Sequence, residues 1–506
     1  MEIPSEILTI AEKLSDSGYK AYLVGGCVRD LLLNKKPKDW DIATDAVPED
    51  ILRMFPNSIY ENSFGTVAVK TNSSDEVLKI VEVTTFRLEG RYSDKRHPDE
   101  IKFAKSIEED LARRDFTVNA LAVRIKSGQS RNGIIPIRDY PCLRRQAGLE
   151  KCLVDPYKGR KDLESKVIRA VGDPTERFNE DALRLMRAVR FACELNFSIE
   201  ENTEMSIKDN AGLLVCIARE RVRDEFARIL LSERAMFGVQ LLEDFGLMRF
   251  IMPELEKGIN CGQNKHHIYN VWEHSLRSLD YATKQNYSLE IRLAALLHDL
   301  GKPDTKRGEG PDSTFYGHEI VGAEMAQRVL GKLKFPKEIV EKVTHLVRYH
   351  LFYYNVGDVT EAGVRRFLRR VGPEYVDDLI KVREADRIGS GVPKAVPYKL
   401  RHLLFMIDKV KKDPISPKML KINGDVLISK LGLEPGPIIG AILDILLDDV
   451  LEDPAKNKEE ILLKRAEDLS SMSYQDLFVL RQKAKSAKEE FEAGIEKEMK
   501  KKHWVK

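Results

Sequence analysis

Two aspartates separated by one residue, Asp39 and Asp41, are the strongest chemical signal in this sequence of 506 residues. On a β-strand their carboxylates would point to the same face, because side chains alternate along a strand. Carboxylate oxygens suit Mg²⁺, a hard cation that often bridges to substrate phosphates. The apolar segment 21–24 ends at Gly25 and Gly26, which allow backbone N–H groups to approach a phosphate closely. This combination favours nucleotidyl transfer, although an isolated aspartate pair on a surface strand more often simply faces water.

Glu82 is a candidate third carboxylate for the same site. It lies between Val81 and Val83 in an apolar, alternating segment, where burying an acid is costly unless a metal or a base pairs with it. A site of this kind could hold two Mg²⁺ ions, which activate a hydroxyl and neutralise the leaving pyrophosphate. The alternative is a glutamate at a strand edge that faces water.

Two adjacent arginines, Arg113 and Arg114, stand in the segment 110–120, which then becomes apolar. The planar guanidinium group suits a triphosphate because it can form two parallel hydrogen bonds. The alternative for this segment alone is a surface ion pair with Asp110 or Asp115.

Arginines recur at three-residue steps, interleaved with apolar residues, in the segment 180–190. We expect a helix that packs inward and carries a basic flank. An Asp181/Arg184 pair would offer acceptors and donors within one turn, which could read the edge of a base. In isolation, such a pair is more often only a salt bridge on a helix surface.

These segments resemble, in order, the motifs of bacterial class II tRNA nucleotidyltransferases, the CCA-adding enzymes and their poly(A) polymerase relatives. The matching segments are 24–30, 39–44, 113–120 and 180–184, and the resemblance covers residues 10–235 apart from 125–150. It implies a catalytic head, a neck that selects the nucleotide, and body and tail domains that hold the tRNA acceptor arm. By position it implies metal binding by Asp39 and Asp41, triphosphate contacts from Gly26, Arg29 and Arg114, base recognition by Asp181 and Arg184, and support from Arg187 and Arg190.

The resemblance also bears on which nucleotides are added. Residues 90–98 look like the flexible loop that this family needs for adding the terminal A, which favours full CCA addition from CTP and ATP. An A-adding enzyme and a poly(A) polymerase remain alternatives, because they share the head and neck motifs. Residues 125–150, rich in Gly and Arg, depart from the family pattern and are read as an insertion or long loop.

A second constellation consists of histidines and aspartates further along the chain. Histidine with carboxylate suits transition metals such as Ni²⁺, Mn²⁺, Co²⁺ or Fe²⁺, although a lone histidine on an apolar helix is usually structural. The ordered set resembles the HD phosphohydrolase superfamily, which implies a metal site at His274, His298, Asp299 and Asp386. His318, His345 and His350 are candidates for a second metal or for phosphate contacts.

The elements that would position these residues suggest a multidomain α+β chain. Its length predicts three or four domains. We predict a small mixed-sheet nucleotidyltransferase head, then a mostly helical neck, an HD domain and a helical tail. The predicted bounds are 1–124 for the head, 125–150 for the insertion, 151–255 for the neck, 256–400 for the HD domain and 401–506 for the tail.

Composition narrows the class of protein. The chain has 83 basic and 81 acidic residues, so its overall charge gives no indication of an RNA partner. Six scattered cysteines, no signal-peptide pattern and no apolar run of membrane-spanning length predict a cytoplasmic protein without a membrane partner. Two other classes stay open: an HD phosphohydrolase with a vestigial head, and an RNA-binding scaffold that binds without turnover.

Overall fold

The computed structural model describes residues 3–60, 65–89, 101–125, 152–264, 268–352, 354, 356 and 359–482. The predicted loop 90–98 and nearly all of the predicted insertion 125–150 lie outside these residues. The chain divides into two compact units, and each is described by itself. The first comprises Met1–Cys261, Thr283–Leu293 and Gln327–Val340; the second comprises Gly262–Ala282, Ala294–Ala326 and Glu341–Lys506.

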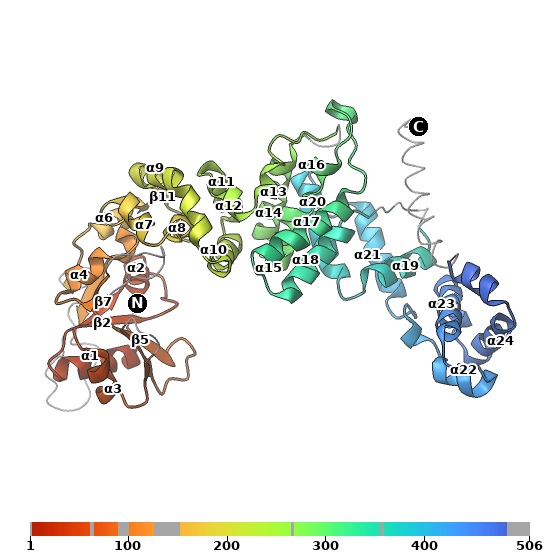
Figure 1. The fold of residues 1–506 in the computed structure, drawn as a ribbon, viewed down its shortest axis with the longest axis horizontal. Coiled ribbons are helices and arrows are strands. Elements are labelled where there is room, and N and C mark those ends of the chain that lie inside the picture. The colour runs from red at the N-terminus through yellow and green to blue at the C-terminus, as the bar shows by residue number, and fades with distance from the viewer. Residues whose placement is uncertain are drawn as a thin grey trace. The chain divides into compact units, whose positions relative to one another are not determined.

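The first unit begins with a head built on a mixed sheet, in the strand order β3-β4-β5-β2-β1-β8-β9 (Figure 1). These strands are β1 (Ala21–Val24), β2 (Asp41–Thr44), β3 (Ile59–Tyr60), β4 (Thr66–Lys70), β5 (Ile80–Thr85), β8 (Ala122–Ile125) and β9 (Leu153–Val154). Among the described strands of this sheet only β2 and β5 pair in parallel, with Asp41 opposite Glu82. A separate hairpin joins β6 (Arg87–Glu89) and β7 (Ile101–Phe103).

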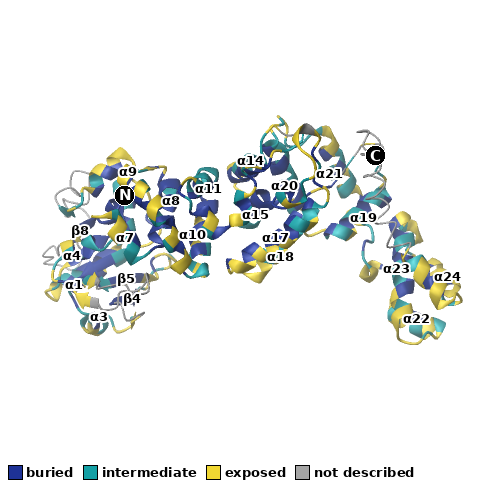
Figure 2. Cartoon of the chain, turned by 45° about the horizontal axis from the view of Figure 1, so that its top comes forward, coloured by how far each residue is buried: buried dark blue, intermediate teal, exposed yellow. Residues whose placement is uncertain are grey.

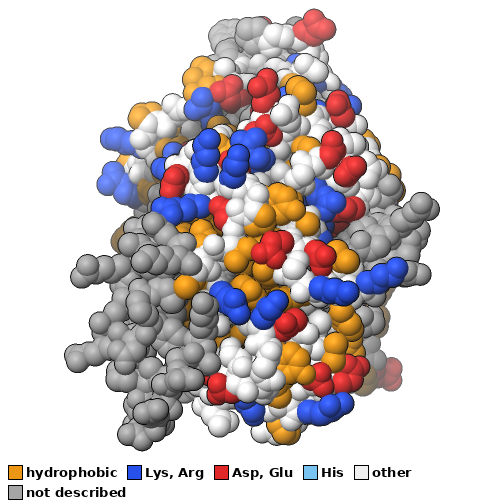
Figure 3. All heavy atoms as spheres, turned by 90° about the vertical axis from the view of Figure 1, so that its left-hand side faces the viewer, with side chains coloured by type: hydrophobic (Ala, Val, Ile, Leu, Met, Phe, Trp, Pro, Cys, Tyr) orange, Lys and Arg blue, Asp and Glu red, His pale blue; other side chains and the backbone are white. Residues whose placement is uncertain are grey.

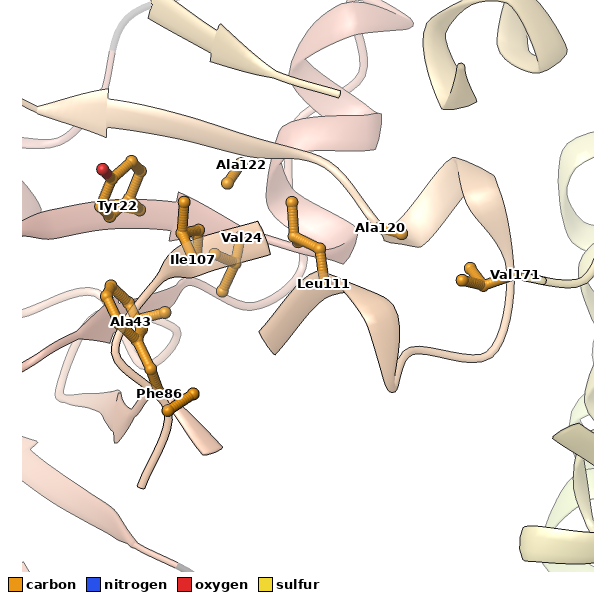
Figure 4. Packing of buried hydrophobic residues seen from close by; sticks show 10 residues of the cluster. Tyr22, Val24, Ala43, Phe86, Ile107, Leu111, Ala120, Ala122 and Val171 are labelled. Atoms are coloured by element: carbon orange, nitrogen blue, oxygen red, sulfur yellow. The ribbon is translucent and has the colours of Figure 1, made fainter. Parts of the chain in front are cut away.

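Strand β1 is buried at every position, and because side chains along a strand point alternately to the two faces, Tyr22 and Val24 share one face of the sheet. Tyr22 and Val24 of β1 lie with Ala43 of β2 and with Leu111, which belongs to α4 (Figure 4). The helices of the head are α1 (Ser5–Asp16), α2 (Gly26–Leu32), α3 (Pro48–Met54) and α4 (Ile107–Ala112). Helix α4 begins at a capping box, in which Ser106 and Glu109 satisfy each other's backbone N–H groups.

The neck that follows is mostly helical, as predicted, with a two-stranded sheet of β10 (Val167–Ile168) and β11 (Ser198–Ile199). Its helices are α6 (Gly159–Ser165), α7 (Pro174–Glu180), α8 (Arg184–Leu195), α9 (Glu201–Asn210), α10 (Arg219–Leu231), α11 (Ala235–Asp244), α12 (Met248–Ile251) and α13 (Pro253–Glu256). The segment 180–190, expected to form one helix, is divided between the end of α7 and the start of α8. Helix α7 ends at Asp181, whose extended backbone (φ −133°, ψ 104°) separates it from α8.

The second unit is helical over the residues that the structure describes. It contains, wholly or in part, α14 (Val271–Lys284), α15 (Leu289–Leu297), α16 (Lys302–Thr305), α17 (His318–Lys332), α18 (Lys337–Tyr349), α19 (Glu361–Val371), α20 (Val376–Gly389), α21 (Tyr398–Val410), α22 (Gly424–Leu431), α23 (Pro437–Glu452) and α24 (Glu459–Ser470). Helices α14, α15, α17 and α20 each present buried side chains (Figure 2), which gives this unit its own core. The prediction of a multidomain α+β chain with a mixed-sheet head and a mostly helical remainder is confirmed.

Two surface properties also match the composition. No helix among the described residues is long and apolar enough to cross a membrane. On the face in Figure 3, Lys and Arg side chains lie among Asp and Glu side chains instead of forming one continuous basic surface. Sites that bind anions must therefore be recognised by local geometry.

Candidate active sites in the head and in the histidine-rich helices

The first candidate site surrounds the turn from β1 into α2. Gly25 has a backbone conformation (φ 71°, ψ −131°) that only glycine adopts without strain. A Cβ on Gly25 would lie 2.7 Å from Arg114 Nη1 and 3.8 Å from Asp41 Oδ2, and one on Gly26 would lie 3.6 Å from Asp39 Oδ1. The turn, both aspartates and an arginine therefore meet at one place, as the sequence predicted for the two aspartates and the glycines.

Asp41 and Glu82 bring negative charge together beside this turn. Asp41 is the first residue of β2, whereas Asp39 lies just before the strand. Burial, followed by the carboxylates of Asp39 and Glu82, raises the pKa of Asp41 to about 7, although Arg114 opposes the shift. A divalent cation would relieve this repulsion with the oxygen ligands that Mg²⁺ prefers, so the residues present fit such an ion.

Arg114 is held in place by a buried aspartate on the preceding helix. Its Nη2 lies 3.2 Å from Asp110 Oδ2, and Arg113 Nη2 lies 2.8 Å from Asp110 Oδ1. Asp110 is only 1% exposed, so the ion pair considered from sequence exists but is not a surface pair. The guanidinium of Arg114 thus lies beside the Gly25 turn.

A chain of hydrogen bonds links the head to the neck. Arg29 Nη1 donates to Asn119 Oδ1 at 2.8 Å, and Asn119 Nδ2 donates to Asp115 Oδ1 at 3.2 Å. Arg187 Nε of α8 donates to Asp115 Oδ2 at 2.8 Å. The sequence suggested Asp115 only as a possible surface partner of Arg113 or Arg114 and gave no role to Asn119, although both residues stand in that motif. Arg29, expected to contact the triphosphate, and Arg187, expected to support nucleotide binding, are thus positioned by one buried carboxylate and one amide.

Asp181 and Arg184 do not form the helix salt bridge that was the alternative to base recognition, because each side chain has another partner. Arg221 Nη2 of α10 lies 2.8 Å from Asp181 Oδ2, and Arg221 Nη1 donates to Asp181 Oδ1 at 3.3 Å. Arg184 instead donates to the carbonyl of Arg113 at 2.9 Å and pairs with Glu180. The backbone of Asp181 is extended where α7 ends, and although the N–H of Arg184 donates to the carbonyl of Asp181 at 3.0 Å, the two side chains take different partners.

Arg190 is placed differently from the other arginines of α8. It is 2% exposed, its Nε lies 3.3 Å from Glu225 Oε2, and its guanidinium covers the ring of Phe191 with 4.3 Å to the centroid. Arg187 and Arg29 also lie over this ring, at 5.2 and 5.5 Å. Arg190 therefore contributes to the neck as a buried structural cation, and its predicted support of nucleotide binding would act through these neighbours.

The second candidate site gathers His274, His298, Asp299 and Asp386 in the second unit. The Nε2 atoms of His274 and His298 are 2.9 Å apart. His274 Nε2 lies 3.1 Å from Asp299 Oδ2 and 3.3 Å from Asp386 Oδ1. All four residues are at most 8% exposed. The four residues chosen from sequence therefore converge on one buried point, from α14, the end of α15 and α20.

The orientation of the histidine rings suits metal coordination. The Nδ1 atoms of His298, His318 and His350 lie 2.7–2.9 Å from the backbone carbonyls of Ala295, Phe315 and Val347. An Nδ1–H that donates to a carbonyl leaves the lone pair on Nε2, which is then the metal-binding atom. The Nε2 atoms of His274 and His298 face each other, so a cation between them could take a lone pair from each once the rings are neutral.

The remaining histidines divide into two kinds. His318 and His350 form a second group with Asp299 whose ligand atoms lie within 4.8 Å of one another. His345 does not join either metal-capable group in the described residues; its Nε2 bonds the carbonyl of Val371, and its ring lies against Tyr349 and Tyr375. The expectation that His345 assists this site is corrected, because its helical position directs it to α19 and α20.

The concentration of carboxylates in this site also favours a bound cation. Burial lowers the pKa of His298, but the carboxylates of Asp299 and Asp386 outweigh it and raise that pKa to about 10. Lys302, which the sequence analysis did not single out, lies 2.7 Å from Asp299 Oδ2 and donates to Gln263 Oε1. Protons on the histidines and the ammonium group of Lys302 thus balance the charge of the carboxylates. A bound divalent metal would supply that positive charge in their place.

The fold and the first site define a nucleotidyltransferase, and the comparisons agree. Three family models match consecutive segments: the poly A polymerase head domain at residues 21–169, the probable RNA and SrmB-binding site of polymerase A at residues 196–259, and the HD domain at residues 271–389. The HD model covers all the residues of the second site. The head and HD domains also imply the use of divalent metal ions.

Similar proteins narrow the class to a family. A CCA-adding enzyme of a Geobacillus species is 41% identical over 454 residues, covering 90% of this chain and 94% of that protein. A CC-adding tRNA nucleotidyltransferase of Thermus thermophilus is 33% identical over 87% of this chain and 92% of that protein. The crystal structure of the Bacillus stearothermophilus CCA-adding enzyme in complex with CTP superposes with a TM-score of 0.65 at 30% identity, covering 92% and 98% of the two chains. The chain belongs to the family of CCA-adding tRNA nucleotidyltransferases.

Proposed function

We propose that this protein adds CCA to the 3′ end of tRNA from CTP and ATP without a nucleic-acid template. The observation that carries the proposal is the convergence of Asp39, Asp41 and Arg114 at the Gly25 turn. The tRNA 3′-hydroxyl would attack the α-phosphate in line, forming a P–O bond as the bond to pyrophosphate breaks. Two Mg²⁺ ions, when bound, would activate that hydroxyl and neutralise the leaving group.

Each side chain has a proposed task in this reaction. Asp39 and Asp41 would hold Mg²⁺, with Glu82 as a third oxygen donor beside Asp41. Gly26, Arg29 and Arg114 would contact the triphosphate, which suits backbone N–H groups and guanidinium forks. Asp181 and Arg184 would read the base edge, supported by Arg187 and Arg190. In the structure, Arg221 forms an ion pair with Asp181, and Arg187 donates a hydrogen bond to Asp115.

The number of nucleotides added is the finer part of the proposal. The resemblance of residues 90–98 to the family's flexible loop supports addition of the terminal A. The similarity to a CC-adding protein keeps CC addition as a competing outcome, and A-only addition and poly(A) synthesis are further ones.

Nucleotide incorporation on three transcripts of one tRNA, ending before CCA, after C and after CC, tests this proposal. With Mg²⁺, CTP and ATP, we expect C, C and A to be added in turn and then to stop. The Asp39→Asn/Asp41→Asn protein should incorporate nothing. Arrest after CC would make the protein a CC-adding enzyme; A on the CC-ended transcript alone would make it an A-adding enzyme. Long A tails would indicate a poly(A) polymerase.

We propose a second function for the histidine-rich site: metal-dependent hydrolysis of phosphate esters at RNA ends, such as 2′,3′-cyclic phosphates. The buried His274, His298, Asp299 and Asp386 cluster favours it. Water would form a new P–O bond, one ester P–O bond would break, and the water proton would pass to the departing oxygen. Ni²⁺, Mn²⁺, Co²⁺ or Fe²⁺ suits these ligands and, when bound, would supply a hydroxide-like nucleophile.

Hydrolysis of an RNA oligonucleotide that ends in a 2′,3′-cyclic phosphate tests the second function. We expect product only with one of these metals, and none from His298→Ala or chelator-stripped protein. Equal hydrolysis by the stripped and loaded proteins would refute it. Because tRNA is the proposed substrate of the head, we expect the protein to act in the cytoplasm.

A further inference from the structure

One aromatic ring of the neck, that of Phe191 on α8, lies against three guanidinium groups. The Cζ atom of Arg190 lies 4.3 Å from the ring centroid, that of Arg187 lies 5.2 Å away and that of Arg29 lies 5.5 Å away. Arg187 and Arg190 belong to the same helix as the ring, whereas Arg29 belongs to α2 of the head. A cation within about 6 Å of an aromatic centroid is attracted to the ring face. Phe191 therefore attracts arginines of both the head and the neck.

The ring is shielded from water and is itself held in place. Phe191 is 5% exposed. Its ring meets that of Phe116 edge to face, with 5.8 Å between the centroids and 80° between the planes. A contact between a cation and a ring is stronger when it is desolvated. The attraction is therefore stronger here than it would be on an exposed surface.

The ring complements the hydrogen bonds that hold the same arginines. Arg29 Nη1 donates to Asn119 Oδ1 at 2.8 Å. Arg187 Nε donates to Asp115 Oδ2 at 2.8 Å. Each of these bonds uses an N–H group of the guanidinium, whereas the ring attracts its charge without using any. More N–H groups thus stay available for phosphate oxygens.

We propose that Phe191 is a positioning residue for the nucleotide, because the face of its ring holds Arg29 of the head and Arg187 of the neck in a fixed relation. Arg29 is assigned to the triphosphate, and Arg187 is assigned to the support of nucleotide binding. One ring would therefore orient both groups before CTP or ATP binds. This role rests on the proposed nucleotidyl transfer.

The competing possibility is that Phe191 only fills space in the core of the neck. The two roles differ in how they depend on the charge distribution of the ring. Fluorine atoms withdraw electrons from the ring face and weaken its attraction for cations, while the shape of the side chain changes little. We would therefore replace Phe191 in the full-length protein by mono-, di- and trifluorinated phenylalanine. The values of kcat and KM for CTP would be measured on the tRNA transcript that ends before CCA.

We expect the KM for CTP to rise with each added fluorine, by about three- to tenfold in the trifluorinated protein, while kcat stays within about twofold. This split is expected because the arginines would contact the nucleotide both before and during the reaction. The KM for ATP on the CC-ended transcript should rise by a similar factor, because both nucleotides carry a triphosphate. Phe191→Leu, which keeps an apolar side chain but has no ring, should resemble the trifluorinated protein.

The matched control is the same fluorinated series at Phe226. This residue is also buried in the neck, on α10. Among the residues that the structure describes, no Lys or Arg lies over its ring. We expect the KM for CTP to stay unchanged across this series. Far-UV circular dichroism checks that every variant folds.

A KM for CTP that stays constant across the Phe191 series, or that rises equally in the Phe226 series, would overturn the positioning role. This result is distinct from failure of the proposed function. In that case the natural protein itself incorporates no nucleotide, and the positioning role falls with the function.

Discussion

At the scale of single residues, the charged side chains of the head and neck are held by charged partners, of which Asp110 and Asp115 are buried and Arg221 is half-buried. Asp110 holds Arg114, Asp115 holds Arg187, and Arg221 holds Asp181. Such partners hold a side chain in place before the substrate binds. The loss of conformational entropy on binding is therefore smaller. Arg221 is the most informative of these partners, because it contacts the residue proposed to read the base.

Arg221→Lys tests whether this partner determines nucleotide choice. Lysine keeps the positive charge but cannot form two hydrogen bonds with Asp181 from one planar group. We expect the ratio of kcat/KM for CTP over UTP to fall about tenfold to hundredfold, with a smaller loss for CTP alone. Single-nucleotide incorporation on the transcript that ends before CCA measures both values.

Arg223→Lys is the matched control for this experiment. Arg223 belongs to the same helix but pairs with Asp224 and with the carbonyl of Lys334. We expect it to leave the CTP/UTP ratio unchanged. Equal losses for CTP and UTP in Arg221→Lys would mean that Arg221 stabilises the neck without affecting selection.

At the scale of elements, the site in the head depends on a turn and on a contact between motifs. The turn between β1 and α2 brings Gly25 and Gly26 to the aspartates and to Arg114. The η1 turn (Thr117–Asn119) carries Asn119 between Arg29 of α2 and Asp115, which in turn bonds Arg187 of α8. These elements make one assembly out of segments that are far apart in the sequence.

We expect Gly25→Ala to lower the stability of the protein and Gly26→Ala to raise the KM for CTP. At Gly25 a Cβ is strained by φ 71° and meets Arg114 Nη1 at 2.7 Å, so we expect a loss of about 1–3 kcal/mol in the free energy of unfolding. At Gly26 a Cβ meets nothing closer than 3.6 Å; stability should hold, while KM for CTP rises because a phosphate cannot approach as closely. Urea unfolding and steady-state kinetics measure these effects; similar stability losses in both variants would contradict them.

The contact between Asp115 and α8 should make stability depend on pH. Burial alone would raise the pKa of Asp115, but Arg187, followed by Arg184, outweighs it and holds that pKa at about 2. The pKa is lower in the folded state than the ordinary aspartate value of about 3.9. This carboxylate therefore stabilises the fold above pH of about 4, and the contribution is lost as pH falls toward 2.

We expect the stability advantage of the natural protein over Asp115→Asn to be about 2 kcal/mol smaller near pH 2 than at pH 7. Urea unfolding followed by the fluorescence of Trp40, in a background with Trp272→Phe and Trp504→Phe, measures it in the head. Asp224→Asn is the control, since that side chain is 62% exposed and its pair with Arg223 should contribute little at either pH. A difference that stays constant across this range would exclude the assigned role of Asp115.

At the scale of the whole molecule, the two candidate sites belong to different compact units. The residues of the head site lie within Met1–Cys261, and those of the histidine-rich site lie in the second unit. Each site is completed by side chains of its own unit, so the chemistry at one does not require residues of the other.

This separation predicts that the two activities can be removed one at a time. Asp39→Asn/Asp41→Asn should reduce nucleotide incorporation by at least about a thousandfold while leaving cyclic-phosphate hydrolysis within about twofold. Asp299→Asn should abolish hydrolysis and leave incorporation intact. Loss of both activities from either change, in protein that remains folded, would show that the units act together.

The sequence by itself determined the local chemistry of this protein. Alternation, spacing and residue type are properties of nearby residues. They were therefore enough to predict the apolar segment 21–24, the paired aspartates, the ordered motifs and the adjacent His298 and Asp299. The mixed-sheet head, the helical remainder and the family followed from them.

Only the tertiary structure decided which partners these residues take. Asp181 pairs with Arg221 at a break between two helices, and His345 lies away from the metal ligands. Asp299 is shared between two histidine pairs. All of these arrangements depend on residues that are distant in sequence. Such pairings are fixed by how helices pack and by which buried polar groups must be satisfied there. Spacing along a single segment carries no information about either.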